Sequence, residues 1–288
     1  MIKVGLSSYS LERAIASGEM SVTDAVQWIA DHGGSHMEVV PAGYDLSDNP
    51  ELIDAIRLKA EDAGIELSNY AVGANFIADN EEAYEREVGR VMREVDIAAR
   101  LGVKRMRHDA GWSDEHSVRC FNRHLGRMAD ACRRIADYAA PYGITTSIEN
   151  HGYLVQGSDR VLTLVQAVDR PNFKLTMDIG NFMCADEDSV AASRRCLPYA
   201  SMVHVKDFYL RHPARNPGEG WFPTTRGNFL RGAIVGHGDV DMPGVMAAIR
   251  DSGFDGYLSI EFEGLEDCRQ ASRMGLDYLS RLAKELGM

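Results

Sequence analysis

Short apolar runs and longer amphipathic segments alternate along the whole chain. Five of the runs follow a glycine that ends a helical pattern, as in DHGGSHMEVV, EDAGIELSNY, ARLGVKRMRH, APYGITTSIE and RDSGFDGYLSIE. Glycine is favoured just after a helix because it adopts the left-handed backbone conformation without strain. We therefore expect a helix to end, and a strand to follow, at Gly33, Gly64, Gly102, Gly143 and Gly253.

Three further runs bring the number of strand candidates to eight: KVGLSSY, NFKLTMDI after Pro171 and SMVHVKDF after Pro198. Between the strands, segments such as Glu81 to Leu101 and Ser117 to Ala140 have apolar residues at helical spacing. Alternating strands and helices are typical of a parallel sheet, and eight such units favour a closed barrel. The sequence predicts the α/β class: a single (β/α)8 TIM-barrel domain over residues 1–288, without a Gly- or Ser-rich linker.

One connection, from Asp207 to Asp239, is longer than the others and lacks helical periodicity. Its aromatic residues disfavour disorder, and long ordered loops in compact domains usually have a function. We predict that residues 207–239 form a lid over the barrel mouth and that Trp221 and Phe222 line a substrate pocket. The alternative is an insertion without a role in binding.

Composition and charge narrow the class of protein. Apolar residues make up 45% and charged residues 26% of the chain, and no apolar run approaches the ~20 residues of a membrane span. The N-terminal MIKVGLSSYS lacks the pattern of a signal peptide, so we expect a cytoplasmic protein without membrane contact. A net charge of −12 disfavours binding to nucleic acid and attracts cations. Five cysteines without a C-x-x-C pair suggest reduced, buried thiols.

Charged and imidazole side chains stand at the C-terminal ends of most strand candidates, where the active site of such a barrel lies. The last four strands end in SIENH, TMDIGN, VHVKD and SIEFEG, which contain Glu149, Asp178, His204 and Glu261. Consecutive strands of a closed barrel bring these residues to one point. Three carboxylates there would repel one another without a cation among them. The sequence therefore predicts one divalent metal ion bound by these four residues.

The donor set restricts the kind of metal site. Carboxylates with one imidazole suit Mn²⁺, Mg²⁺, Co²⁺, Fe²⁺ or Zn²⁺, and the lack of thiolates argues against a closed structural zinc site. Four protein ligands leave room for two substrate oxygens in an octahedral shell. We expect the metal to be catalytic.

The segments SIENHG, MDIGN, VHVKDF, GHGDVD and YLSIEFEG, in this order, resemble the xylose isomerase-like barrel superfamily, and specifically its sugar phosphate isomerase/epimerase branch. The resemblance covers essentially the whole chain. It implies that Glu149, Asp178, His204 and Glu261 bind one divalent metal, usually manganese. It also implies that the two glutamates form an acid/base pair on opposite sides of a bound hydroxy-ketone.

The same superfamily contains apurinic-site endonucleases, which use more histidines to bind three zinc ions. Here Asn181 stands where the nuclease motif has a metal-binding histidine, and IELSNYAV contains no histidine. Together with the negative net charge, this disfavours a nuclease.

The expected reaction is metal-dependent isomerisation or epimerisation of a sugar or keto-sugar through an enediolate. A carboxylate removes a proton beside a polarised carbonyl group, and its return to the other face or to the adjacent carbon gives an epimer or an isomer. Loss of a β-leaving group would instead make the protein a lyase, such as an inosose dehydratase-like enzyme or one that cleaves a keto-glycoside or C-glycoside by elimination. A non-catalytic, metal-stabilised binding protein is a further alternative.

Other side chains are candidates for contact with the substrate. His151 and Lys206 stand two residues after Glu149 and His204, hence on the same strand faces, and we expect both to take part in catalysis. Further candidates for substrate contact are Glu38, His108, Asn181, Trp221, Arg226 and His237. The expected partner is a small-molecule carbohydrate, and association into a homo-oligomer or with a partner subunit stays open.

Overall fold

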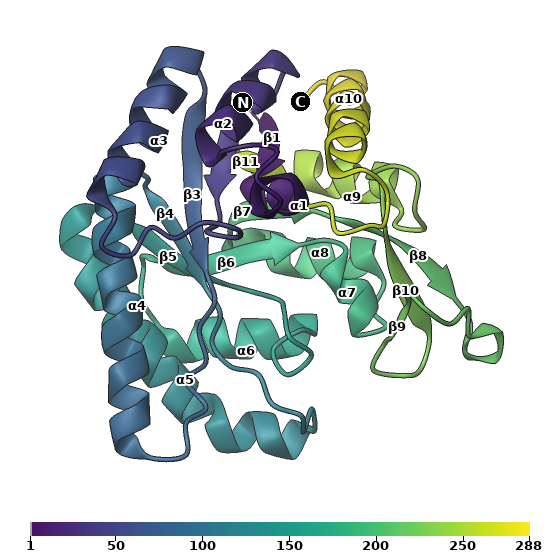
Figure 1. The fold of residues 1–288 in the computed structure, drawn as a ribbon. Helices are drawn as coiled ribbons and strands as arrows, with labels where there is room; N and C mark the ends of the chain where they lie inside the picture. The colour runs from purple at the N-terminus through teal and green to yellow at the C-terminus, as the bar shows by residue number, and fades with distance from the viewer. Residues whose placement is uncertain (1) are drawn as a thin grey trace.

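Eight parallel strands form a closed barrel in the order β1–β11–β7–β6–β5–β4–β3–β2 (Figure 1). The protein is represented by a computed structural model that describes residues 2–288. The barrel strands are β1 (Lys3–Ser7), β2 (His36–Val39), β3 (Glu66–Val72), β4 (Arg105–His108), β5 (Thr145–Glu149), β6 (Phe173–Asp178), β7 (Ala200–Val205) and β11 (Tyr257–Ile260). All eight predicted strands are present, and the predicted (β/α)8 barrel is confirmed.

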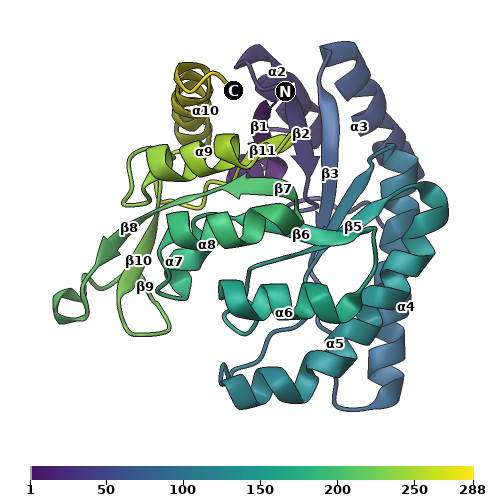
Figure 2. The ribbon, with the colours of Figure 1, turned by 180° about the vertical axis from the view of Figure 1, so that it is seen from behind.

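Helices surround the barrel on its outside (Figures 1 and 2). Gly64 and Gly102 directly follow two of them, with φ of 70° and 79°. These two helices therefore end at a left-handed glycine, as predicted. The longer helices are α2 (Val22–Asp31), α3 (Pro50–Ala63), α4 (Glu81–Leu101), α5 (Val118–Ala139), α6 (Ser158–Val168), α8 (Ser189–Cys196), α9 (Met242–Asp251) and α10 (Cys268–Glu285). The shorter ones are α1 (Glu12–Ala16), α7 (Asn181–Cys184) and the 3₁₀ turns η1 (Ser8–Leu11), η2 (Ala140–Tyr142), η3 (Leu197–Tyr199) and η4 (Pro213–Arg215).

The first and last strands of the barrel are neighbours. β1 pairs with β11 from Lys3↔Tyr257 to Leu6↔Ile260, and β11 pairs with β7 on its other side. The sheet is closed by segments from the two ends of the chain, whose termini lie on the same side of the molecule (Figure 1).

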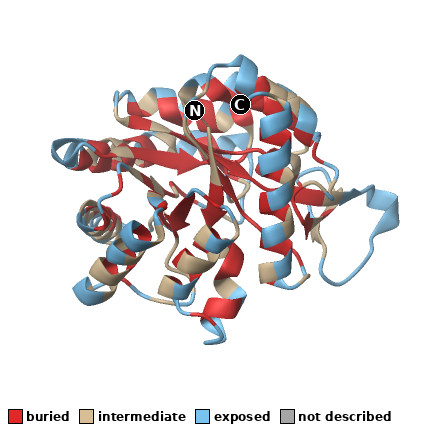
Figure 3. Ribbon diagram, turned by 90° about the horizontal axis from the view of Figure 1, so that it is seen from above, coloured by how far each residue is buried: buried red, intermediate tan, exposed pale blue. Residues whose placement is uncertain are grey.

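The two faces of the barrel strands differ in chemistry. Side chains alternate between faces along a strand, so partners in parallel register share a face. The outward face carries residues such as Leu6, Met37 and Ile148, which belong to one buried core. The barrel strands are mostly buried (Figure 3). The inward face is mostly polar, with registered positions that include Ser7, Glu38, Asn69, Arg107, Ser147, Thr176, His204 and Ser259. The interior of this barrel is therefore a site for charged groups.

Residues 207–239 contain a small antiparallel sheet that the sequence did not predict. Its strands are β8 (Asp207–Arg211), β9 (Phe222–Pro223) and β10 (Phe229–Ala233), in the order β8–β10–β9. The sheet projects from one side of the barrel (Figures 1 and 2). Phe208 and Leu230 anchor its base in a small apolar cluster with Cys184.

Two expectations from composition can be compared with the structure. All five cysteines are free and buried, as predicted. Within residues 2–288, no helix combines the length and apolarity that crossing a membrane requires.

Candidate metal centre

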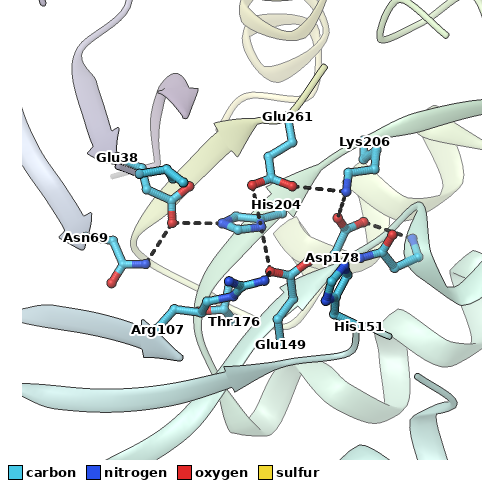
Figure 4. A network of polar contacts seen from close by, with 12 residues as sticks. Glu38, Asn69, Arg107, Glu149, His151, Thr176, Asp178, His204, Lys206 and Glu261 are labelled. Carbon is cyan, nitrogen blue, oxygen red and sulfur yellow. Dashed lines mark hydrogen bonds and ion pairs between the residues drawn. The ribbon is translucent and has the colours of Figure 1, made fainter. Parts of the chain in front are cut away.

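The four predicted metal ligands meet inside the mouth of the barrel (Figure 4). Glu149, Asp178, His204 and Glu261 each offer one donor atom, and these atoms lie within 4.8 Å of one another. Strand register explains the convergence, because Asp178 pairs with His204 and the amide of Glu261 continues the ladder by donating to the carbonyl of Val205. All four residues are buried.

Three atoms of this cluster have the properties of metal donors. Oε2 of Glu149, Oδ2 of Asp178 and Nδ1 of His204 are buried and have no hydrogen-bond partner among the described residues. The two carboxylate oxygens do contact cationic side chains, but not in hydrogen-bond geometry. Buried polar atoms are rarely left without a partner, and carboxylate with imidazole is a donor set for divalent cations. The residues present therefore fit a metal ion.

Glu38 orients the histidine of the cluster. Nε2 of His204 lies 2.9 Å from Oε1 of Glu38, and Nδ2 of Asn69 donates to the same oxygen at 2.7 Å. A proton on Nε2 directed at Glu38 leaves Nδ1 to face Glu149 and Glu261, at 3.4 and 3.5 Å. Such a carboxylate behind a histidine fixes its tautomer and strengthens it as a metal ligand.

The segments after β5 and β6 position the two predicted ligands that end these strands. The amides of Gly180 and Asn181 donate to Oδ1 of Asp178 at 2.8 and 2.9 Å, which leaves Oδ2 for another partner. Nδ2 of Asn181 donates to Oε1 of Glu149 at 2.9 Å. Asn150 extends the pairing of β5 with β6, because its side-chain amide both accepts from the amide of Asp178 and donates to its carbonyl.

Two permanent cations neutralise part of the negative charge. Nη2 of Arg107 lies 2.6 Å from Oε2 of Glu149 and 3.2 Å from Asp109. Nζ of Lys206 lies 3.2 Å from Asp178, 3.0 Å from Glu261 and 3.5 Å from Glu263. The six carboxylates in or beside the centre are Glu38, Asp109, Glu149, Asp178, Glu261 and Glu263. Negative charge exceeds positive charge, which favours binding of a further cation.

The pKa values follow from this balance. Burial alone would raise the pKa of Glu149, but Arg107 and His204 hold it well below its usual range. Burial would lower the pKa of Lys206, but Asp178, Glu263 and Glu261 raise it well above its usual value. For Asp178, burial raises the pKa to about 6 against the opposing effect of Lys206, with a further upward contribution from Glu149 and Glu261. In the metal-free protein Glu149 is thus ionised and Lys206 charged.

Some predicted substrate residues lie at the cluster and others do not. Glu38 and Asn181 contact the ligands as described, and His151 lies with Nδ1 3.5 Å from Asp109, its side chain half exposed. His108 lies on the outer face of β4, where its ring packs against Phe76 and Phe173, so the structure does not bring it to the cluster.

The other three predicted substrate residues belong to the segment 207–239. The Trp221 ring is contacted by Arg211 and Arg231 on the projecting sheet, and His237 is exposed in the turn after β10. Arg226 lines a surface cavity near the β5–α6 connection. None of the three is in the immediate cluster.

A cavity of about 290 Å³ adjoins the cluster of predicted metal ligands. Glu149 and His151 form its inner side, and Ala110, Trp112 and Val155 contribute apolar surface. This volume is at the lower end of the range for small-molecule sites. The cavity therefore gives a small ligand access to one carboxylate of the cluster.

Arg107 is the most important residue of the site that the sequence analysis missed. The end of β4 reads RMRHD, in which His108 is the residue expected at the site from its type. Arg107 pairs in register with Ser147, which stands two residues before Glu149, so Arg107 and Glu149 share the inward face. The register between β4 and β5 identifies Arg107 as a residue of the inward face. Residue type alone favours the histidine next to it.

Comparison with known proteins agrees with this architecture. Residues 26–282 match the family described as Xylose isomerase-like TIM barrel. The inosose dehydratase of Lacticaseibacillus casei is 24% identical over 144 residues, covering 48% of this chain and 46% of that protein. The structure of an L-ribulose 3-epimerase has a TM-score of 0.76 at 16% identity, covering 100% of this chain and 96% of its own. A xylose isomerase-like TIM barrel protein from Mycobacterium smegmatis, solved in complex with magnesium, has a TM-score of 0.74 at 14% identity, covering 99% and 97%. At such identity the two structures establish a shared fold alone.

Proposed function

Because the chain belongs to the xylose isomerase-like TIM barrel family, we propose that it is a divalent-metal-dependent isomerase or epimerase of a sugar or keto-sugar. The observation that carries the proposal is the convergence of Glu149, Asp178, His204 and Glu261 beside a small cavity. A cation enclosed for stability alone would not need a carboxylate ligand that also faces a cavity. The proposed ion is Mn²⁺, with Mg²⁺, Co²⁺, Fe²⁺ and Zn²⁺ compatible with the same donors.

We propose Glu149 and Glu261 as the acid and base. Glu149 ends β5 and Glu261 follows β11, and the two carboxylates approach Nδ1 of His204 from different strands, at 3.4 and 3.5 Å. A substrate between them would expose its two faces to different carboxylates. One removes the proton beside the carbonyl group to give an enediolate, and the other returns a proton from the opposite side.

The neighbouring side chains have supporting roles in this proposal. Arg107 keeps Glu149 ionised, and Lys206 places a positive charge beside Asp178 and Glu261, where negative charge on a substrate oxygen would develop. His151, on the wall of the small cavity, is in position to bond a substrate hydroxyl. When bound, a divalent cation would supply Lewis-acid stabilisation of negative charge on adjacent substrate oxygens.

A lyase is a second candidate. The same proton abstraction leads to elimination when the carbon next to the deprotonated one carries a hydroxyl or glycosidic oxygen as a leaving group. The inosose dehydratase of L. casei is similar to about half of this chain. The two candidates share the first step and differ in whether the substrate loses a group.

The role of residues 207–239 as a lid stays a proposal. The tip of the β9–β10 hairpin contributes Thr225 and Arg226 to the cavity near the β5–α6 connection. Shortening the hairpin should impair turnover more than folding, and unchanged kinetics would speak against a lid.

The proposal is tested by metal analysis followed by incubation in deuterated water. Metal-loaded and metal-stripped protein are each mixed with a ketose, an inosose or a keto-glycoside, and the products are followed by NMR. We expect about one divalent ion per chain, and deuterium at a carbon next to the carbonyl group only with the loaded protein. Loss of water or of an alcohol would identify the lyase. Absence of deuterium from all three compounds would contradict the proposal.

A further inference from the structure

A second, larger cavity of about 580 Å³ lies next to the small cavity at Glu149. The two cavities have His116 and Tyr153 in common. The rings of these residues are stacked, with centroids 5.1 Å apart and planes at 18°. The stacked pair therefore forms the boundary between a cavity that reaches the metal cluster and one that does not.

Tyr153 is held at this boundary from two directions. Its backbone has a left-handed φ of 60°, and its amide donates to Oε1 of Gln156 at 2.6 Å. Its hydroxyl donates to the carbonyl of Pro223 at 2.7 Å, on the projecting sheet. Tyr153 thus connects the loop after the β5 ligand to the β9–β10 hairpin.

The hairpin is fixed as the far wall of the larger cavity. Asp186 accepts hydrogen bonds from the side chains of Thr224, Thr225 and Asn228 and from the amide of Arg226, at 2.6 to 3.0 Å. This carboxylate sets the turn that presents Thr225 and Arg226 to the cavity. The Arg226 guanidinium has no hydrogen-bond or ion-pair partner among residues 2–288, although its backbone is anchored.

The lining of the larger cavity indicates the class of ligand. Two guanidinium groups, of Arg160 and Arg226, are balanced by two carboxylates, of Asp159 and Glu187. Aromatic and hydrogen-bonding groups complete the wall: His116, Phe121, Asn122, Tyr153, Thr163 and Thr225. Rings beside amide and hydroxyl groups suit a sugar, which has apolar faces and a rim of hydroxyls. A phosphate would meet the carboxylates as well as the arginines, so a neutral ligand fits better.

We propose that the substrate has two units, a keto-sugar ring in the small cavity and a neutral glycosyl unit in the larger one, with Tyr153 and His116 against the linkage. This inference rests on the proposed function for the reacting ring, and adds a subsite that recognises the second unit. It makes the substrate a keto-glycoside of disaccharide size rather than a free monosaccharide.

The first test compares two substrates in solvent-deuterium exchange: the 3-keto derivative of glucose and that of maltose. We expect wild-type protein to favour the disaccharide in kcat/KM. Thr163→Trp fills the larger cavity from an exposed position of α6, and it should abolish the preference while leaving exchange of the keto-monosaccharide in place. Gln166→Trp, an exposed position on the same helix that does not line the cavity, is the matched control.

A second pair of variants concerns the unpaired guanidinium. Arg226→Ala should raise KM for the keto-disaccharide about tenfold, the loss that one charge-assisted hydrogen bond typically gives. Arg215→Ala, in η4 of the same projecting segment and outside the cavity, should have no effect. Equal use of both sugars by wild-type protein, or an unchanged preference in Thr163→Trp, would overturn the inference.

A binding measurement separates this inference from the proposed function. Saturation-transfer NMR with unoxidised maltose requires no turnover, and we expect transfer to both glucose units in wild-type protein and to one unit in Thr163→Trp. Transfer to a single unit in wild-type protein would overturn the two-unit substrate even if both keto-sugars exchanged. If maltose binds through both units but neither keto-sugar exchanges, the subsite stands and the proposed reaction fails. If methyl phosphate displaces maltose, the cavity binds an anion and the proposal of a neutral ligand is wrong.

Discussion

Nη2 of Arg107 lies 2.6 Å from Oε2 of Glu149, at the point where that carboxylate faces the other proposed metal ligands. The arginine side chain is 13% exposed and the glutamate 1%, so the pair is largely removed from water. A buried carboxylate needs partners, and besides Asn181 and His204 the permanently charged Arg107 serves Glu149 in the metal-free protein. The arginine thus maintains Glu149 in the charged form that a metal ligand requires.

We predict that Arg107→Met destabilises the metal-free protein by about 3–5 kcal/mol, because it removes the permanent cation beside the buried Glu149. Addition of Mn²⁺ should restore part of the loss, since the metal supplies positive charge at the same place. Urea unfolding with and without Mn²⁺ measures both effects. Arg123→Met, which removes an exposed arginine 3.9 Å from Glu115, is the control and should change stability little. Equal urea midpoints for Arg107→Met and wild type would show that Glu149 does not depend on the arginine.

We predict that Asp178→Ala loses the metal and the activity together. Its Oδ2 is buried, has no hydrogen-bond partner among the described residues, and lies within the ligand cluster. Metal content per chain can be measured by mass spectrometry after dialysis. Asp186→Ala is the control, because that carboxylate bonds the hairpin and is not in the cluster. Full metal occupancy in Asp178→Ala would show that Asp178 is not a metal ligand.

We predict that Glu149→Gln and Glu261→Gln retain much of the metal but lower turnover by roughly 10²–10⁴-fold. Glutamine keeps a carbonyl oxygen for the metal but cannot exchange protons as a carboxylate does. Each variant should be assayed for solvent-deuterium exchange as well as for product, because the base and the acid affect different steps. Deuterium exchange at the wild-type rate in both variants would show that neither glutamate is the base, and His151 or Lys206 would become the better candidate.

We predict a loss of stability on acidification that involves His108. Burial lowers the pKa of His108 to about 4 from the usual 6.5, so its stabilising contribution is complete above pH 6.5 and is lost as the pH falls towards 4. The unfolded chain takes up the proton first, and between pH 7 and 4.5 this costs about 2–3 kcal/mol.

His108→Gln should remove that part of the pH dependence, because the amide can still donate to the Asp109 carbonyl that Nδ1 of His108 contacts at 2.8 Å. Urea unfolding at pH 7 and pH 4.5, in EDTA, compares the two proteins. His36, whose pKa burial also lowers to about 4, would still contribute in the variant. The same pH dependence in His108→Gln and wild type would show that His108 is not responsible.

The strands and the ligand cluster could be predicted because both depend on local sequence. A polar residue at the end of an apolar run marks a strand end, and parallel strands bring their ends together, so Glu149, Asp178, His204 and Glu261 could be located without coordinates. Arg107 required the register between β4 and β5. For the same reason His108, one residue later, faces away from the site.

Long-range contacts account for the other features that the sequence did not predict. The strands β8, β9 and β10 are short and include Arg211, Pro223 and Gly232, so they lack the alternation of a typical strand. Asp186 bonds residues about 40 positions later, and nothing in its neighbourhood indicates this. The two cavities arise from loops that meet only in the folded chain.

The pairing of β1 with β11 has a consequence during synthesis. A chain emerging from the ribosome contains Glu149, Asp178 and His204 long before residue 261, but β11 can insert between β7 and β1 only after residues 257–260 have emerged. Until then β1 and β7 are each paired on one side only, with β2 and β6, and such open strand edges are prone to association with other chains. Because Glu261 directly follows β11, the insertion of β11 between β1 and β7 also brings the last of the four proposed ligands to the cluster. A nascent chain that stops before residue 261 therefore lacks one carboxylate of the cluster, and the full set of proposed metal ligands is available only after β11 has been synthesised.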